Sequence, residues 1–172
     1  MERTKKERSN KPVNQELLAK AKKVMRQKID ELKKLPADNK IVKANQHLFT
    51  DSFSASAWPA AGELWVGGVG PVFEASANLY TVSNPVLHVD ITASGWGAAL
   101  GGFECEVAGA FAYNPSQMPS NCQVTIIADD EALGGCSLTV MSNSGAFLGQ
   151  FIGPAEGLGG CYITHSGTMT VS

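Results

Sequence analysis

Residues 62 to 82 read GELWVGGVGPVFEASANLYTV, and this stretch has the texture of most of the chain. Short apolar runs alternate with small polar residues, which is the period-two pattern of half-buried strands. Glycines such as Gly67 and Gly68 stand inside these runs. Glycine weakens a flat strand but permits the bends and coiling of a small closed barrel. The stretch therefore predicts strands of a tightly coiled sheet.

The same pattern extends from this stretch to the end of the chain, and all 18 glycines lie after residue 44. Runs rich in Pro, Gly, Asn and Ser separate the candidate strands and predict tight turns, including one at Pro59. The strands are expected at 46–57, 62–70, 72–82, 86–93, 97–113, 122–128, 136–142, 146–153 and 160–171. Short strands at this spacing favour an all-β antiparallel barrel with a compact interior.

Charge divides the chain in two. All 14 Lys and Arg residues and six acids lie within residues 1–43, whereas the remainder has ten acids and no Lys or Arg. We therefore predict a basic helical arm over 1–43 and a glycine-rich acidic β domain over 44–172. A domain without cations cannot replace the counterions of a phosphate backbone, so nucleic-acid binding by the β domain is not expected.

Apolar residues recur every three or four positions between Asn14 and Leu35, which predicts an amphipathic helix. Asn14 is its expected N-cap, and Pro36 is expected to stop it. Its other face carries the residues predicted to bind a partner or a membrane: Lys20, Lys22, Lys23, Arg26, Lys28, Lys33 and Lys34. Such a helix can lie on an anionic membrane, dock on a protein partner or pack on its own domain.

Membrane-spanning and secretory segments are not predicted. The chain has no run of about 18 apolar residues, as a transmembrane helix requires. No apolar region follows the basic N-terminus, so a cleaved signal peptide is not expected either. Export by a route that needs no signal peptide, or residence in the cytoplasm, both stay open.

Four cysteines (Cys105, Cys122, Cys136 and Cys161) are spaced unlike any paired zinc motif, so neither a metal site nor a cofactor is expected. Buried free thiols are the favoured interpretation, and disulfides are the alternative in an oxidising compartment.

No catalytic residue is predicted. Glu104 and Glu106 lie on one face of a predicted strand and are expected to be exposed carboxylates. The acidic run at 129–131 lacks the spaced ligands of a calcium loop. Three tryptophans, Trp58, Trp65 and Trp96, are either barrel aromatics or a patch that contacts lipid or a ligand.

A weak internal repeat joins residues 91–103 (ITASGWGAALGGF) and 139–151 (TVMSNSGAFLGQF). Both contain Ser-Gly, a short bridge and Leu-Gly-X-Phe. The repeat predicts one hairpin pattern that is used twice.

The second part of the chain, from residue 46 to 172, resembles the virulence-associated (Vap) proteins of actinobacterial pathogens. The motifs that carry the resemblance are Leu79-Tyr80-Thr81, Leu138-Thr139-Val140-Met141, Ser144-Gly145-Ala146-Phe147-Leu148-Gly149 and the glycine-rich end at 157–172. The resemblance implies a compact eight-stranded antiparallel Greek-key barrel without a large ligand cavity. It also implies a secreted protein that acts on host endomembranes and has no established catalytic residues. This sequence departs from the family in its missing signal peptide, its cysteines and its helical arm.

Together these observations predict a non-enzymatic β-barrel effector, secreted or translocated, that acts at host membranes or endosomal compartments. Its basic helix would contact an anionic membrane or a protein partner. The alternatives are an assembly subunit that docks through its helix, with oligomers as a consequence, and a carrier of a small apolar ligand. A cytoplasmic location is the alternative to export.

Overall fold

Two α-helices precede nine strands in the part of the chain that the computed structural model describes, residues 15–49, 58–69, 71–96, 98–99, 103–129, 135–154 and 161–172. The helical elements are α2 (Gln15–Lys33), α3 (Lys40–Ala44) and the 3₁₀ helices η1 (Gln46–Phe49) and η2 (Pro115–Gln117). The strands are β1 (Trp58–Val69), β2 (Val72–Thr81), β3 (His88–Trp96), β4 (Ala98–Ala99), β5 (Phe103–Phe111), β6 (Asn121–Asp129), β7 (Gly135–Ser142), β8 (Phe147–Pro154) and β9 (Cys161–Val171).

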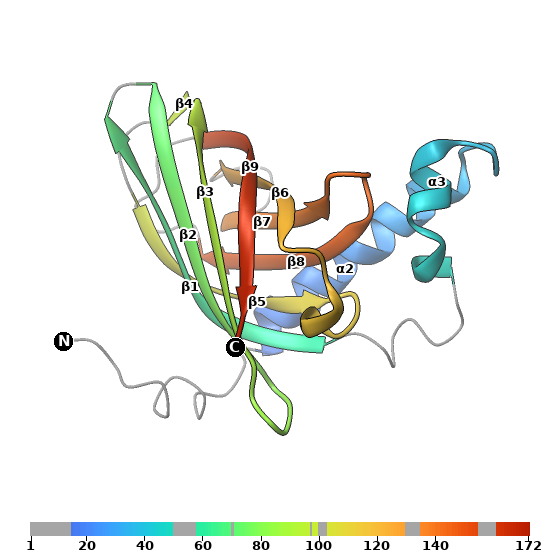
Figure 1. Ribbon diagram of the computed structural model, residues 1–172, viewed down its shortest axis with the longest axis horizontal. Helices are drawn as coiled ribbons and strands as arrows, with labels where there is room; N and C mark the ends of the chain where they lie inside the picture. Colours follow the sequence, from blue (N-terminus) through green and yellow to red (C-terminus); the bar gives the residue numbers. More distant parts are fainter. Residues whose placement is uncertain are drawn as a thin grey trace.

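Eight of these strands form a closed antiparallel barrel. Their order is β3-β2-β1-β5-β8-β7-β6-β9, and pairing between β3 and β9 closes the ring (Figure 1). After the β1–β2–β3 meander, β5 returns to lie beside β1, and after β6–β7–β8, β9 returns beside β6. Each half therefore has the spatial order of a Greek key. The predicted eight-stranded Greek-key barrel, preceded by a helix, is confirmed.

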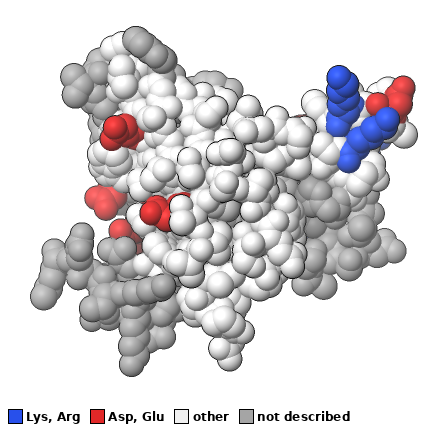
Figure 2. Space-filling model, viewed as in Figure 1, with Lys and Arg blue, Asp and Glu red and all other residues white. Residues whose placement is uncertain are grey.

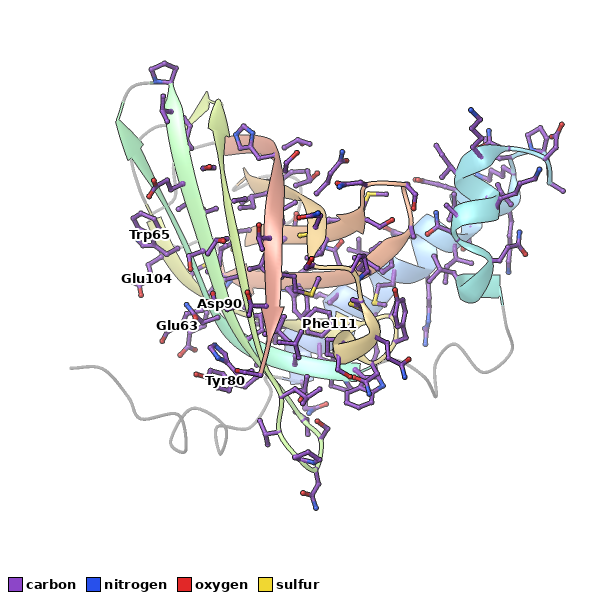
Figure 3. All side chains as sticks on the ribbon, viewed as in Figure 1. Glu63, Trp65, Tyr80, Asp90, Glu104 and Phe111 are labelled. Carbon is purple, nitrogen blue, oxygen red and sulfur yellow. The ribbon has the colours of Figure 1, made fainter. Side chains whose placement is uncertain are left out.

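The barrel interior is filled by alternate residues of every long strand, as the period of two requires. Phe111 and Phe151 lie edge to face with ring centroids 4.9 Å apart, and Figure 3 shows Phe111 pointing into the barrel. A small space beside Leu64, Ile91 and Leu138 measures about 10 Å³. That space is close to the minimum for one water molecule, so this part of the interior holds no room for an organic ligand.

Gly62 and Gly109 are two positions at which glycine permits the close approach of neighbouring strands. A Cβ atom on Gly62 would overlap the Asn78 carbonyl on β2, and one on Gly109 would overlap the Gln150 carbonyl on β8. Backbone atoms cannot move aside as a flexible side chain can. The coiling inferred from the glycine-rich pattern is therefore realised at these contacts.

Helix α2 confirms the predicted amphipathic helix and packs on the outside of the barrel, against β5 and β8 (Figure 1). Its buried residues Leu18, Met25 and Ile29 form a second apolar cluster with barrel residues, mainly small ones: Ala108, Ala110, Ala112 and Phe147. Burial of each large side chain of this kind stabilises the fold by roughly 1.5–3 kcal/mol. The apolar face of the helix is thus occupied by its own barrel.

Asn45 joins the arm to the barrel through a buried side-chain amide. Its Nδ2 atom donates to the carbonyls of Ile41 (2.8 Å) and Gly145 (2.9 Å), and its Oδ1 atom accepts from the Phe147 N–H (2.6 Å). The amide therefore bonds to α3 on one side and to the β7–β8 hairpin on the other. Because Asn45 is only 1% exposed, these bonds are shielded from water.

The prediction of a strand over 46–57 is wrong for residues 46–49, which form η1, and residues 50–57 lie outside the described part of the chain. The apolar Leu48 is buried in the cluster beneath α2 instead of in a sheet. The Leu48 N–H donates to the carbonyl of Asn45, so Asn45 also shapes this turn through its backbone.

Three other expectations need correction. Pro59 does not form a turn but lies near the start of β1, where its carbonyl accepts from the Val82 N–H. The strand predicted over 97–113 is divided into β4 and β5. The repeat is not one hairpin used twice, because 139–151 spans the β7–β8 hairpin whereas 91–103 runs from β3 to β5, which do not pair. The predicted boundary between the basic arm and the β domain, at residues 43 and 44, falls within α3 and stays a prediction.

Replacing Gly109 with Ala is expected to lower the free energy of unfolding by roughly 1–3 kcal/mol, because the new methyl group meets backbone. Urea denaturation followed by circular dichroism measures this change. The control is Ser94→Ala on the exposed side of β3, which should leave stability nearly unchanged. Equal stability of G109A and wild type would refute the close approach.

Replacing Asn45 with Ala is expected to cost about 1–3 kcal/mol, because the Phe147 N–H loses a buried acceptor. Asn39→Ala is the matched control, since the Asn39 side chain accepts only an exposed bond from the Ile41 N–H. Thermal and urea unfolding of both variants give the comparison. A larger loss of unfolding free energy in Asn39→Ala than in Asn45→Ala would contradict the role of Asn45 in joining the arm to the barrel.

Candidate functional site

The predicted binding residues of the arm form an exposed surface, here called the basic face: Lys20, Lys22, Lys23, Arg26, Lys33 and Lys34. All belong to α2 or to the turn that follows it, and all are exposed. Lys28 also belongs to α2, but its side chain lies outside the described residues. Because the apolar side of α2 packs on the barrel, the helix holds these cations toward solvent.

Acids on the helix offset this charge only in part. Lys20 Nζ lies 3.6 Å from Glu16 Oε1, one turn away, and both side chains are largely exposed. Surface pairs of this kind contribute little, typically below about 1 kcal/mol. With the exposed Asp30 and Glu31 counted as well, three acids stand against the six cations of the basic face, which therefore keeps a net positive charge.

The outer surface of β1, β2, β3 and β5 carries a second charged region, here called the acidic face: Glu63, Glu74, Asp90, Glu104 and Glu106. Figure 2 shows Asp and Glu side chains over these strands, and Lys and Arg side chains, with an acidic group beside them, at the other end of the molecule near α3. No Lys or Arg follows Lys43 in the sequence, so the barrel supplies no cation to balance this face.

Strand register places two acids of this face directly opposite each other. Glu63 pairs with Glu106, and Trp65 pairs with Glu104, across β1 and β5. Figure 3 shows Glu63, Trp65 and Glu104 on the outside of the barrel. Glu104 and Glu106 are exposed, with the half-buried Cys105 between them packing against the interior, as the alternation predicted. Like charges in this position destabilise a sheet.

His88 on this surface is held by its neighbours on β2. His88 stacks on Tyr80 with ring centroids 4.7 Å apart, and its Nε2 atom lies 3.4 Å from the Asn78 Oδ1 atom. The Asp90 Oδ1 atom is buried and accepts no hydrogen bond from the described residues. Within the same residues, no group of three or more His, Cys, Asp or Glu side chains is placed to hold a metal ion.

An open groove of about 520 Å³ crosses the outer side of β2, β3 and β9. Trp65 and Glu74 stand at its edge, and small residues such as Ala93 and Gly167 line it. Most of the remaining lining is hydroxyl or amide: Ser76, Thr92, Ser94, Asn121, Ser166 and Thr168. Glu74 is the only charged residue in the described lining, so this part of the groove suits neutral polar or cationic groups better than anions.

The three tryptophans do not all share one surface. Trp58 is half-buried and packs against the barrel core, whereas Trp65 is 44% exposed on the outer side of β1. The side chain of Trp96 lies outside the described residues. A joint patch of Trp58 and Trp65 is therefore not formed.

Two thiols that the sequence did not associate meet inside the barrel wall. The Sγ atoms of Cys105 on β5 and Cys136 on β7 are 2.7 Å apart, while Cys122 is buried elsewhere. The hydrogen bond from Cys105, together with the Gly153 backbone, lowers the pKa of Cys136. The same bond and burial raise the pKa of Cys105. Their separation of 31 residues along the chain does not predict this contact. The only hint in the sequence is the alternation of each strand, which places both cysteines on its inner side.

None of the described helices is long and apolar enough to span a membrane.

Comparison with known proteins gives one structural similarity. No family model matches the chain, and no curated protein matches it. A solved structure that does match is the virulence-associated protein VapB from the intracellular pathogen Rhodococcus equi, with 16% sequence identity and a TM-score of 0.44. The match covers 66% of this chain and 95% of that one. The neighbour is thus a virulence-associated protein, as the sequence resemblance implies, and membership of that family stays a prediction.

Replacing Glu63 with Gln is expected to raise the free energy of unfolding by about 0.2–1 kcal/mol at low salt, because it removes the repulsion from Glu106. High salt should reduce the gain, since exposed charges are screened. Urea unfolding at both salt concentrations gives the measurement. The control is Glu104→Gln, whose register partner is Trp65. Equal gains in the two variants would argue against a repulsion specific to the Glu63–Glu106 pair.

Proposed function

We propose that this protein is a non-enzymatic β-barrel protein that binds an anionic membrane surface through the basic face of α2. The observation that carries the proposal is the burial of Leu18, Met25 and Ile29 against the barrel. This packing orients α2, so that its Lys and Arg side chains point outward together.

The binding would be electrostatic and peripheral. Each Lys or Arg close to an anionic leaflet contributes about 1 kcal/mol. The apolar side of α2 is covered by β5 and β8, so it is not free to enter the lipid. Repulsion between the acidic face and the same lipids would turn that face away, which gives the bound protein one preferred orientation.

The biological setting belongs to the proposal as well. We expect the protein to be secreted or translocated by a route without a signal peptide and to act at host membranes or endosomal compartments, as the sequence resemblance implies. A cytoplasmic location is the alternative. The setting rests on that resemblance, whereas the membrane contact rests on the geometry of α2.

The two other functions fit the described structure less well. A docking helix for an assembly subunit would offer its apolar side to a neighbour, but here that side is occupied by the barrel of the same chain. A carrier of an apolar ligand needs an apolar cavity. The space beside Leu64, Ile91 and Leu138 measures about 10 Å³, and the open groove is lined mainly by polar groups.

The proposal is tested by co-sedimentation of the full chain with vesicles of phosphatidylcholine, with and without phosphatidylserine. The variant Lys22→Gln/Arg26→Gln removes two charges from the basic face, and Lys40→Gln/Lys43→Gln removes two charges from α3. We expect binding to the anionic vesicles only. The first variant should bind about 5–30-fold more weakly, as the loss of roughly 1 kcal/mol per charge implies, and the second should stay close to wild type.

Several outcomes would count against the proposal. They are equal binding to neutral vesicles, equal losses in the two variants, and binding that does not weaken with salt. A concentration-dependent dimer in size-exclusion chromatography, without vesicle binding, would favour the assembly function instead.

A further inference from the structure

We infer that Cys105 and Cys136 are a dithiol site that an oxidant of the disulfide class converts into an intramolecular disulfide. The two residues come from β5 and β7, and their sulfur atoms lie 2.7 Å apart. A disulfide bond is about 2.0 Å long, so only a small movement separates the thiols from bonding distance. Cys136 is buried, whereas Cys105 is only partly buried and is the more accessible of the two.

Strand β8 lies between β5 and β7, and Gly153 is the feature that lets the sulfurs meet across it. Gly153 pairs with Cys136, and a Cβ atom at this position would lie 3.0 Å from the Cys136 Sγ atom and would overlap the Glu106 carbonyl. Any larger residue would therefore fill the space that the sulfur occupies.

The pair sits where the backbone ladder between β5 and β8 ends. That ladder runs from Phe111↔Gly149 to Ala108↔Ile152, so Cys105 lies beyond its last pair. On its other side Cys105 is still paired with Leu64 of β1. A bond between Cys105 and Cys136 would link β5 to β7 beyond the last backbone pair that β5 and β8 form among the described residues.

The oxidation balances with one external disulfide, R–S–S–R. The Cys105 sulfur, after loss of its proton to solvent, attacks one sulfur of the oxidant, and the first R–S⁻ leaves. The Cys136 sulfur then attacks Cys105 Sγ, the bond to the second R–S group breaks, and that thiolate leaves. The protein loses two electrons and two protons, and the oxidant becomes two thiols after it takes up the protons.

The electrostatics of the pair suit the second step. The thiolate is the attacking form of cysteine. In the dithiol, the hydrogen bond from Cys105 and that from the Gly153 backbone lower the pKa of Cys136. In the mixed disulfide Cys105 has no S–H to donate, and the Gly153 bond is the one that still favours the Cys136 thiolate. Cys136 is therefore placed to resolve a mixed disulfide formed at the more accessible Cys105.

The other cysteines define the controls. Cys122 is buried, burial raises its pKa, and its Sγ atom lies near Gly167. Cys161 and Cys136 both pair in register with Ala128, on β9 and β7. A Cys136–Cys161 bond is therefore the competing product that the experiment must distinguish.

The full chain is treated with oxidised glutathione, or with a reducing agent, and then alkylated at low pH. Mass spectrometry of peptic fragments assigns the bond, since the β domain has no Lys or Arg for trypsin. We expect one disulfide, Cys105–Cys136, in wild type and in Cys122→Ala, and no such bond in Cys105→Ala. Oxidation should raise the melting temperature of wild type by roughly 5–10 °C, as a typical disulfide does in a domain of this size.

The comparison of oxidised with reduced wild type needs no variant, so it stands even if a substitution impairs folding. A bond between Cys136 and Cys161, or free Cys105 and Cys136 after oxidation, would overturn the inference. Because this site is separate from the basic face of α2, neither result bears on vesicle binding.

Discussion

The contact between α2 and the outer side of β5 determines what the rest of the molecule can present. Ala108 and Ala110 on that strand and Ala112 directly after it contact the helix, and their small side chains let it approach closely. Leu18, Met25 and Ile29 are buried there, so the hydrophobic effect fixes which side of the helix faces water. A helix that was free in solution could turn its apolar side toward lipid or another protein.

The wall on which α2 rests depends in turn on the tight coiling of the barrel. Gly62 and Gly109 let neighbouring strands approach to distances that a Cβ atom would forbid. Each Greek key adds a return strand beside its first strand, and the β3–β9 pairing then closes the ring. Closure removes the free edges that would otherwise offer backbone groups to other chains. The barrel is thus a rigid support whose side chains, rather than its edges, make contacts.

The sequence predicted those features that repeat along the chain and missed those that depend on single distant contacts. Helical spacing located α2 almost to its ends, and the glycine-rich alternation predicted the barrel. Residues 46–49 look strand-like by composition, but the buried amide of Asn45 holds that turn against a hairpin about 100 residues away. The Cys105–Cys136 contact likewise arises from strand order, which no local spacing encodes.

Basic and acidic residues are separated along the chain, and the packing of α2 on the barrel keeps the cations of the helix apart from the acidic face. Attraction between a basic arm and an acidic body could also have brought the two together, but then each charge would have been partly neutralised by the other. Instead the apolar cluster and the Asn45 amide fasten the arm, and both depend little on ionic strength. The cations of α2 therefore remain available to another surface. Salt that weakens such an association would act mainly on the association itself, because the described contacts by which α2 packs on the barrel are apolar.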